Sequence, residues 1–245
     1  MTRTPSASSP LLCIAHRGGR TLGEENTLAT IEKGLALGAD AIEIDVWSVA
    51  GELIVTHDRY LGRVIKGEGR LMDVDAEGLN NLRTLGDQPV PTLQQVITVV
   101  GDRARLNIEL KGPRCAPQVA EQVLSFCRDK HFDIEQYIIS SFDHQQLYWL
   151  YQHHPQLLRG ALICHIPLDY AQCCDALGAY SFHPNVDFIT PELVDDAHKR
   201  NAKVWVYTVN EEQDFAELSA MGVEGVFTDY PDRLLAFNKT LSPSG

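Results

Sequence analysis

Two apolar segments of this sequence are interrupted by carboxylates near their carboxyl ends. AIEIDV (residues 41–46) carries Glu43 and Asp45, and LNIELK (residues 106–111) carries Glu109. Because residues two apart on a strand share a face, each segment would turn its acidic side chains to one side. Three unpaired carboxylates are costly to bury together, and a divalent cation would remove that cost. This all-oxygen set favours Mg²⁺, Ca²⁺ or Mn²⁺ over zinc, and the alternative is an edge strand with solvated carboxylates.

Two histidines end other strand-like runs. The run LLCIA stops at His16 and Arg17, which two glycines follow, and the run LIVT stops at His57. Two imidazoles near a divalent cation can act as general base and general acid at neutral pH. Arg17 and Lys111 add positive charge that suits a phosphate group. Together these residues indicate chemistry on a phosphoester.

These residues lie in an alternation of short β-rich runs and longer amphipathic runs, which is typical of a parallel sheet with crossover helices. The predicted strands are Leu11–Ala15, Ala41–Val46, Leu53–Thr56, Arg105–Leu110, Tyr137–Ser140, Ala161–Cys164, Asp187–Ile189, Lys203–Tyr207 and Gly225–Phe227. The predicted helices are Asn26–Leu37, Thr92–Val100, Pro117–Lys130, His144–Gln152, Pro191–Arg200 and Glu211–Met221.

The number of these units predicts an α/β fold, a (β/α)8 TIM barrel. If Leu53–Thr56 pairs back as a hairpin, eight β/α units remain. A doubly wound open sheet is the alternative, but no GxGxxG motif follows the first strand, where a dinucleotide fold requires it. Residues 57–91 exceed an ordinary connection and predict a small insertion after the second barrel strand. This insertion is either a substrate wall or a surface excursion.

Length and composition give the domain organisation that we expect. A single barrel domain would span residues 11–238, with an insertion at 58–91 and tails at 1–10 and 239–245. The net charge of −12 argues against nucleic-acid binding. Six cysteines match neither a zinc site nor a disulfide framework, which favours free thiols in a reducing cytosol. Without a signal-like or membrane-spanning stretch, we expect a cytoplasmic protein with no stable membrane insertion; its oligomeric state stays open.

The sequence resembles the glycerophosphodiester phosphodiesterase family, in particular its short bacterial cytosolic members. The resemblance runs in order from about residue 11 to residue 235. The motifs that carry it are HRGG (16–19), EENT (24–27), EIDV (43–46), THD (56–58), IELK (108–111), SSF (140–142) and VYTVN (206–210). Each motif alone is a weak signal, and His-Arg-Gly is common by chance, but seven motifs in order at plausible strand ends are a strong one.

The resemblance implies a TIM-barrel enzyme of lipid and glycerol metabolism that hydrolyses glycerophosphodiesters to sn-glycerol 3-phosphate and an alcohol. It implies one divalent cation, Mg²⁺, Ca²⁺ or Mn²⁺, and a capping role for residues 58–91. By position, the residues that match the family's site are the acid/base pair His16 and His57, the metal ligands Glu43, Asp45 and Glu109, the phosphate-facing cations Arg17 and Lys111, and the substrate-binding residues Glu25, Asn26, Phe142 and Tyr207.

Two positions depart from the family's usual pattern. Glu24 stands where a proline usually precedes Glu-Asn-Thr, which alters local rigidity but no catalytic atom. Tyr207 stands where many members have tryptophan, which leaves the preferred alcohol open. We expect His16 to act as the base and His57 as the acid. The first nucleophile is either water or the glycerol 2-hydroxyl.

Three other functions are alternatives. A lysophospholipase D-like enzyme would differ only in accepting an acyl chain on the glycerol. A phospholipase C-like enzyme also uses paired histidines, but it needs a membrane-docking helix or basic patch that the sequence does not show. A non-catalytic glycerol-phosphate binding protein would have no need of a proton-transfer pair.

Overall fold

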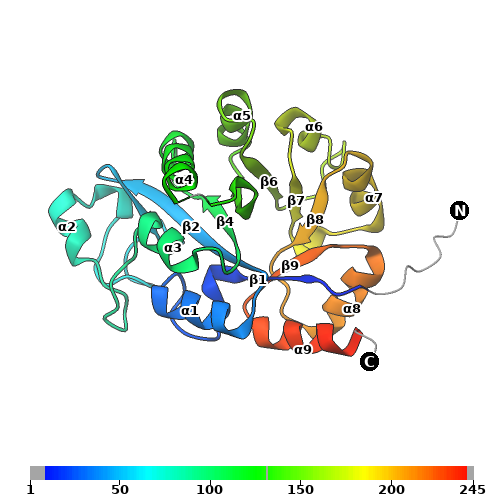
Figure 1. Cartoon of the computed structure of the whole chain (residues 1–245), viewed down its shortest axis with the longest axis horizontal. Coiled ribbons are helices and arrows are strands. Elements are labelled where there is room, and N and C mark those ends of the chain that lie inside the picture. Colours follow the sequence, from blue (N-terminus) through cyan, green and yellow to red (C-terminus); the bar gives the residue numbers. More distant parts are fainter. Residues whose placement is uncertain (1–8, 131, 242–245) are drawn as a thin grey trace, which may run out of the picture.

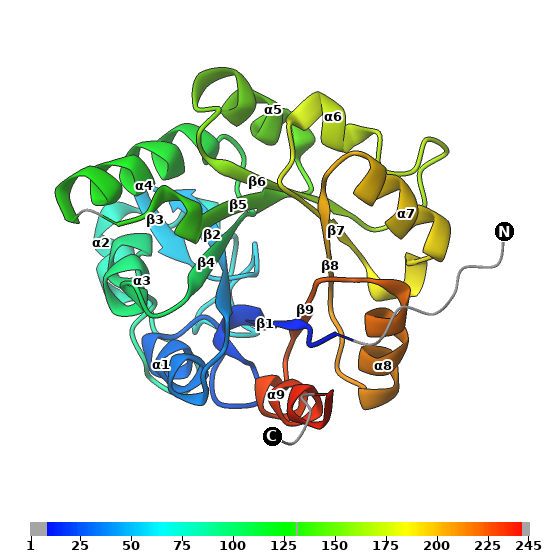
Figure 2. The ribbon, with the colours of Figure 1, turned by 45° about the vertical axis from the view of Figure 1, so that its right-hand side comes forward.

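The computed structural model describes residues 9–130 and 132–241. Within these residues, eight parallel strands form a closed barrel, and helices cover its outer surface (Figures 1 and 2). The barrel strands are β1 (Leu12–Ala15), β2 (Ala41–Val49), β4 (Arg105–Leu110), β5 (Tyr137–Ser141), β6 (Leu158–Ile163), β7 (Ser181–Pro184), β8 (Lys203–Val206) and β9 (Gly225–Thr228). The predicted fold class is confirmed.

Strand β1 closes the barrel because it pairs on both sides. Ile14 lies opposite Ala41 of β2 and opposite Phe227 of β9. The predicted hairpin is also present: β3 (Glu52–Val55) pairs antiparallel with the end of β2. This hairpin carries the chain away from the barrel at the mouth, where the strands end.

Helices fill the connections in the described part of the chain. They are α1 (Leu28–Leu37), α2 (Ala76–Asn81), α3 (Leu93–Val100), α4 (Ala116–Lys130), α5 (His144–His153), α6 (Cys173–Leu177), α7 (Pro191–Lys199), α8 (Glu212–Met221) and α9 (Pro231–Leu241). Short 3-10 turns lie at His16–Gly18, Leu71–Asp73, Ile134–Gln136 and Val186–Phe188. None of the helices in residues 9–130 and 132–241 is long and apolar enough to cross a membrane.

The strands bury two separate apolar layers. Outward residues of β2, such as Ile42 and Ile44, belong to the large core between the strands and the helices. Inside the barrel, Ile14, Trp205 and Phe227 form a second buried cluster. The alternation in β2 therefore turns its apolar residues toward the helices and leaves Glu43 and Asp45 on the barrel's inner side.

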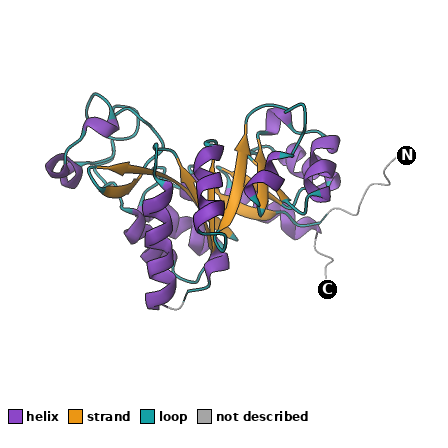
Figure 3. Cartoon of the chain, turned by 90° about the horizontal axis from the view of Figure 1, so that it is seen from above, coloured by secondary structure: helices purple, strands orange, loops and turns teal. Residues whose placement is uncertain are grey.

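The segment between β3 and α3 has a small core of its own. Trp47 and Ile54 from the hairpin pack with Ile65, Leu71 and Leu82 from the insertion. The segment that holds α2 stands out to one side of the barrel (Figures 1 and 3). This core stabilises the insertion against the hairpin rather than against the main barrel core.

One predicted strand was wrong. The sequence predicted a strand at Asp187–Ile189. The structure instead has strand β7 at Ser181–Pro184, and Val186–Phe188 form a 3-10 turn. The reason is a local cap, because the side-chain oxygen of Asn185 accepts the backbone N–H of Asp187. Such an Asx turn favours a turn even where the composition of the segment favours a strand.

Helix α9 was not predicted, and it extends past residue 238 into the predicted C-terminal tail. It packs on the barrel through Asn238, whose side chain bonds both the N–H and the carbonyl of Leu11, at 3.0 Å and 2.7 Å. Residues 1–8 and 242–245 of the two predicted tails lie outside the described residues. All six cysteines lie within the described part, and each has a free thiol.

Candidate active site

Three carboxylates meet at the carboxyl ends of β2 and β4. The ladder between these strands sets Asp45 opposite Glu109 and Glu43 opposite Asn107. One oxygen from each of Glu43, Asp45 and Glu109 lies within 4.8 Å of the others. Glu43 and Asp45 are buried, and the Glu109 side chain is 12% exposed. The structure thus brings the predicted ligand set together.

The electrostatics of this cluster fit a divalent cation. Burial, with the charges of Asp45 and Glu109, raises the pKa of Glu43 well above its usual range. Burial and the charge of Asp45 also raise the pKa of Glu109 to about 7. Glu43 Oε1 and Asp45 Oδ1 are buried without a hydrogen-bond partner. A bound Mg²⁺, Ca²⁺ or Mn²⁺ would satisfy these oxygens and favour the ionised carboxylates.

A small cavity lies at the centre of the barrel mouth. It has a volume of about 20 Å³, and its lining includes His16, Glu43, Glu109 and Tyr207. A space of that size holds one ion or one water. His16 therefore faces the same space as two of the three carboxylates.

The loop after β1 contacts the carboxylates directly. The backbone N–H of Arg17 donates to Glu43 Oε2 at 2.8 Å, and Arg17 Nε lies 3.4 Å from Asp45 Oδ2. Arg17 has a left-handed φ of 52°, and Gly18 follows with φ 85°. A Cβ at Gly18 would lie 3.1 Å from the backbone nitrogen of Ile31. Glycine thus allows α1 to approach this loop, which carries Arg17 next to the carboxylates.

Asn26 and Arg17 hold Asp45 from one side. Asn26 is buried, has φ 60° and donates from Nδ2 to Asp45 Oδ2 at 2.9 Å. Burial alone would lower the pKa of Arg17, but the charges of Asp45, Glu25 and Glu43 outweigh it and raise that pKa. The guanidinium therefore stays charged beside the carboxylates.

His16 pairs with a carboxylate from the last barrel strand. Its Nδ1 lies 2.8 Å from Oδ1 of Asp229, which follows β9 directly. Burial would raise the pKa of Asp229, but hydrogen bonds from His16 and Asn210 outweigh it and lower that pKa. An ionised carboxylate can only accept, so Nδ1 carries the hydrogen and Nε2 is left for the site.

His57 forms a similar pair next to the insertion. Its Nδ1 lies 2.8 Å from Oδ1 of Asp58, and Arg63 bonds both oxygens of that carboxylate. The hydrogen bond from Arg63 lowers the pKa of Asp58 to about 2. Burial lowers the pKa of His57, whose environment includes the charges of Asp45 and Arg17. Both histidines thus have an Nδ1–carboxylate partner and an Nε2 that the carboxylate does not occupy.

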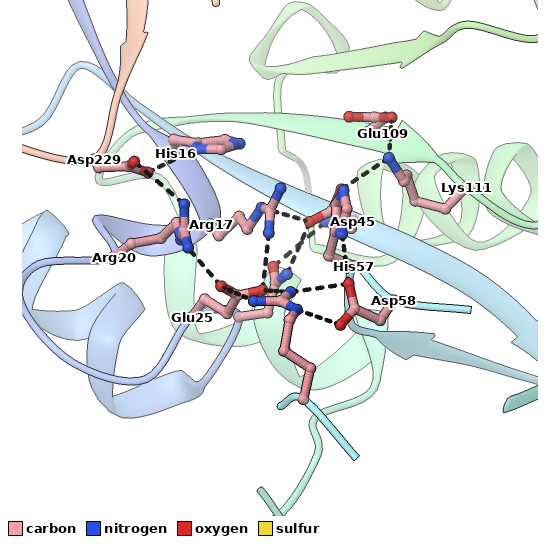
Figure 4. Close-up of polar contacts among 12 residues, drawn as sticks. His16, Arg17, Arg20, Glu25, Asp45, His57, Asp58, Glu109, Lys111 and Asp229 are labelled. Carbon is pink, nitrogen blue, oxygen red and sulfur yellow. Dashed lines mark hydrogen bonds and ion pairs between the residues drawn. The ribbon is translucent and has the colours of Figure 1, made fainter. Parts of the chain in front are cut away.

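Glu25 connects the two histidine pairs (Figure 4). It accepts from Arg17 at 2.8 Å, from Arg20 at 3.0 Å and from Arg63 at 2.7 Å. Burial would raise the pKa of Glu25, but the hydrogen bond from Arg63 and the charge of Arg17 outweigh it and lower the pKa to about 2. Arg20 continues the chain of contacts to Asp229 at 3.3 Å.

The remaining predicted site residues directly follow three barrel strands: Lys111 follows β4, Phe142 follows β5 and Tyr207 follows β8. Lys111 Nζ donates to Glu109 Oε1 at 2.9 Å and lies 5.8 Å from the ring centre of Phe142. Phe142 meets Tyr207 edge to face with ring centres 5.7 Å apart. The Tyr207 hydroxyl donates to the carbonyl of Ile163 at 2.8 Å, which fixes the ring.

Sequence reasoning did not single out several residues of this network. Asp229, Asp58, Arg20 and Arg63 bond the predicted residues directly. Asp58 and Asp229 had a usable signal, since a carboxylate that ends a barrel strand or follows a site histidine is a candidate orienting group. The two arginines lie in irregular loops and carried no such signal.

Comparisons with known proteins place the chain in a family. Residues 16–233 match the family model described as the glycerophosphoryl diester phosphodiesterase family. A glycerophosphodiester phosphodiesterase of Caldanaerobacter subterraneus subsp. tengcongensis is 34% identical, over 91% of this chain and 96% of its own. One from Bacillus altitudinis is 32% identical, over 93% of this chain and 98% of its own.

Solved structures share the fold. An Oleispira antarctica phosphodiesterase, in complex with its product sn-glycerol-3-phosphate, has a TM-score of 0.82 and 26% identity, and covers 92% of this chain and 96% of its own. A glycerophosphodiester phosphodiesterase of Thermotoga maritima has a TM-score of 0.75 and 24% identity, and covers 92% and 97%. At that lower identity the likeness extends to the fold alone.

Proposed function

The chain belongs to the glycerophosphoryl diester phosphodiesterase family, and from that premise we propose that it hydrolyses glycerophosphodiesters to sn-glycerol 3-phosphate and an alcohol. The observation that carries the proposal is the meeting of two histidine–carboxylate pairs around three clustered carboxylates. The product complex of the Oleispira antarctica relative supports the choice of product.

Glu43, Asp45 and Glu109 would hold one divalent cation, Mg²⁺, Ca²⁺ or Mn²⁺. When bound, the cation supplies positive charge that stabilises the phosphorane-like transition state. Two protein cations add to this charge, since Arg17 and Lys111 border the same carboxylates and are suited to bind phosphate oxygens. Asn26 and Glu25 orient Asp45 and Arg17.

His16 and His57 transfer the protons. In our assignment, His16 Nε2 removes the proton of the nucleophile and His57 protonates the leaving alkoxide. Asp229 and Asp58 fix the tautomers by accepting from Nδ1. Water and the glycerol 2-hydroxyl are the two candidate nucleophiles. Attack by the 2-hydroxyl would form a cyclic glycerophosphate, so trapping of that compound would identify the 2-hydroxyl as the nucleophile.

We further propose one catalytic domain at residues 11–238, with residues 58–91 as its cap and Phe142 and Tyr207 lining the substrate pocket. The six free thiols support localisation of the protein in a reducing cytoplasm. The net charge of −12 supports a small-molecule substrate over nucleic acid.

The test is metal-dependent formation of glycerol 3-phosphate. Protein stripped with EDTA is incubated with a panel of glycerophosphodiesters, then given Mg²⁺, Ca²⁺ or Mn²⁺. We expect turnover with at least one ion, and its loss in Glu43→Gln and Asp45→Asn. Glu121→Gln, on the exposed face of α4, is the matched control and retains activity. No product with any ion would contradict the proposal, and faster hydrolysis of lysophosphatidylcholine than of glycerophosphocholine would favour a lysophospholipase D.

A further inference from the structure

Two pockets of different character border the residues of the candidate site. The insertion pocket, of about 780 Å³, is lined by His57 and Lys111 from the site, Trp47 from β2, and Tyr60 and Met72 from the insertion. The second, which we call the β1 pocket, has about 420 Å³. The insertion pocket is therefore the larger space next to a proposed catalytic histidine.

The two pockets differ in the charged side chains that line them. The β1 pocket has two arginines, Arg20 and Arg63, against three carboxylates: Glu24, Glu25 and Asp229. The lining of the insertion pocket contains the four cations Arg59, Arg63, Arg70 and Lys111 against the one carboxylate of Asp58. The lining of the insertion pocket is therefore richer in cationic side chains than that of the β1 pocket.

Most of these cations are compensated by carboxylates nearby. Arg63 pairs with Asp58 and Glu25, and Arg70 pairs with Asp73. Lys111 pairs with Glu109, as described above. These pairs fix the side chains but leave little net charge.

Arg59 is different. In residues 9–130 and 132–241 no carboxylate forms an ion pair with it, and its guanidinium lies 5.2 Å from the ring centre of Tyr60. Tyr60 is 52% exposed and Met72 is 43% exposed, so an apolar surface lies next to this cation. A polyol can donate and accept at the polar groups and pack its C–H faces on the rings. An ammonium group would meet Arg59 as a like charge.

From these observations we infer that the insertion pocket binds the leaving alcohol and selects an uncharged or anionic polyol head group over a cationic amino alcohol. The inference rests on the proposed function. In that reaction, the oxygen of the nucleophile bonds to phosphorus and gives its proton to the base, the bond between phosphorus and the head-group oxygen breaks, and the leaving alkoxide takes a proton from the acid. A donor must reach that oxygen, and His57 borders this pocket while His16 lines the central cavity. Arg59 is then a specificity-determining residue.

Three diesters that differ in head-group charge test the inference. Glycerophosphoglycerol and glycerophosphoinositol have neutral head groups, and glycerophosphocholine has a quaternary ammonium. We expect kcat/KM to be about tenfold higher for the neutral pair at low ionic strength, with a smaller ratio at high salt. Arg59→Glu should reduce that ratio or invert it, mainly through a lower KM for glycerophosphocholine. Arg128→Glu on α4 makes the same charge change away from the pocket and should leave the ratio unchanged.

The outcomes separate the two proposals. Absence of turnover for every diester overturns the proposed function and this inference with it. Turnover with equal kcat/KM for the three diesters, or a ratio that Arg59→Glu does not change, overturns the pocket assignment alone. An acyl chain in the pocket is a third outcome that overturns it: lysophosphatidylcholine would be the better substrate, and Arg59→Glu would affect both choline diesters alike.

Discussion

The two histidines have the same local chemistry but are held by different parts of the molecule. His16 follows β1 and pairs with Asp229 after β9, so closure of the barrel brings together residues 213 positions apart. His57 follows β3 and pairs with its own neighbour, Asp58. The His16 and Asp229 side chains are 13% and 12% exposed, and those of His57 and Asp58 are 31% and 21%. One pair is thus fixed by the sheet and the other depends on the insertion.

The insertion is fastened to the barrel by polar contacts rather than by the main core. Arg63 joins Asp58 to Glu25, which follows β1. Glu24, its neighbour, accepts from Thr84 Oγ1 at 2.8 Å, from the Gly86 N–H at 2.8 Å and from Gln88 at 3.0 Å. Glu24, which stands where the family usually has proline, therefore joins the β1 loop to residues 84–88 of the insertion. We call its three hydrogen bonds to these residues the latch. The comparison predicts that the barrel side is rigid and the insertion side adjustable.

The largest effect is expected when either imidazole is removed. His16→Ala and His57→Ala should each lower kcat by ~10²-fold or more, because each removes one of the two proton transfers. His153→Ala, at the exposed end of α5, is the matched control and should retain kcat. Steady-state kinetics with glycerophosphoglycerol measure this. Full activity in either variant would end the two-histidine scheme.

Replacing the two carboxylate partners tests the structural difference itself. Asp229→Asn should lower kcat by roughly 10²-fold, because an amide can present an N–H to Nδ1 and favour the wrong tautomer. Asp58→Asn should lower kcat by only about tenfold, because the His57–Asp58 pair is more exposed and His57 is freer to rearrange. Asp232→Asn, exposed at the start of α9, is the control for the first variant. Equal losses would show that the barrel and the insertion orient their histidines equally well.

The pH profile of kcat/KM tests whether His57 acts as the acid or as the base. Burial lowers the pKa of His57, whereas the hydrogen bond to Asp58 raises it, so Asp58→Asn should lower that pKa further. An acid must be protonated, and its loss of protons produces the descending limb of kcat/KM. With His57 as the acid, the alkaline limb moves to lower pH in the variant. If the acidic limb moves to lower pH instead, His57 is the base and the assignment is reversed.

The barrel half of the site could be read from the sequence, and the insertion half only in part. The alternation in β2 and β4 predicted the shared face of Glu43, Asp45 and Glu109, because a strand's period of two is a local property. Asp229 follows the last strand, and barrel closure decides its contact with His16, which no local pattern encodes.

The contacts of the insertion depend on tertiary placement. Glu24 was expected to affect only local rigidity, and its three hydrogen bonds became visible only where residues 84–88 lie against the β1 loop. The wrong position of β7 has a different origin. Composition favoured a strand at Asp187–Ile189, while one cap from Asn185 decided for a turn. Patterns thus predicted most of the regular elements, but not α9 or the position of β7, and they predicted the irregular segments poorly.

The smallest effect is expected from the latch. Glu24→Ala removes an acceptor of three hydrogen bonds, which should loosen residues 84–88 by about 1–3 kcal/mol and raise their amide hydrogen exchange. Because Arg63 still joins Asp58 to Glu25, kcat/KM should fall only severalfold.

A matched control for the latch lies in the same loop. Asp87→Asn weakens the exposed pair with Lys66, which contributes at most about 1 kcal/mol, and asparagine still adopts the left-handed φ of 66° at this position, so it should change neither exchange nor activity. The Glu24→Ala variant should leave the exchange of β1 and β9 unchanged, since His16 and Asp229 do not depend on the insertion. Loosening of those strands in Glu24→Ala would mean that the two halves form one cooperative unit. The contrast between a rigid barrel side and an adjustable insertion side would then be wrong.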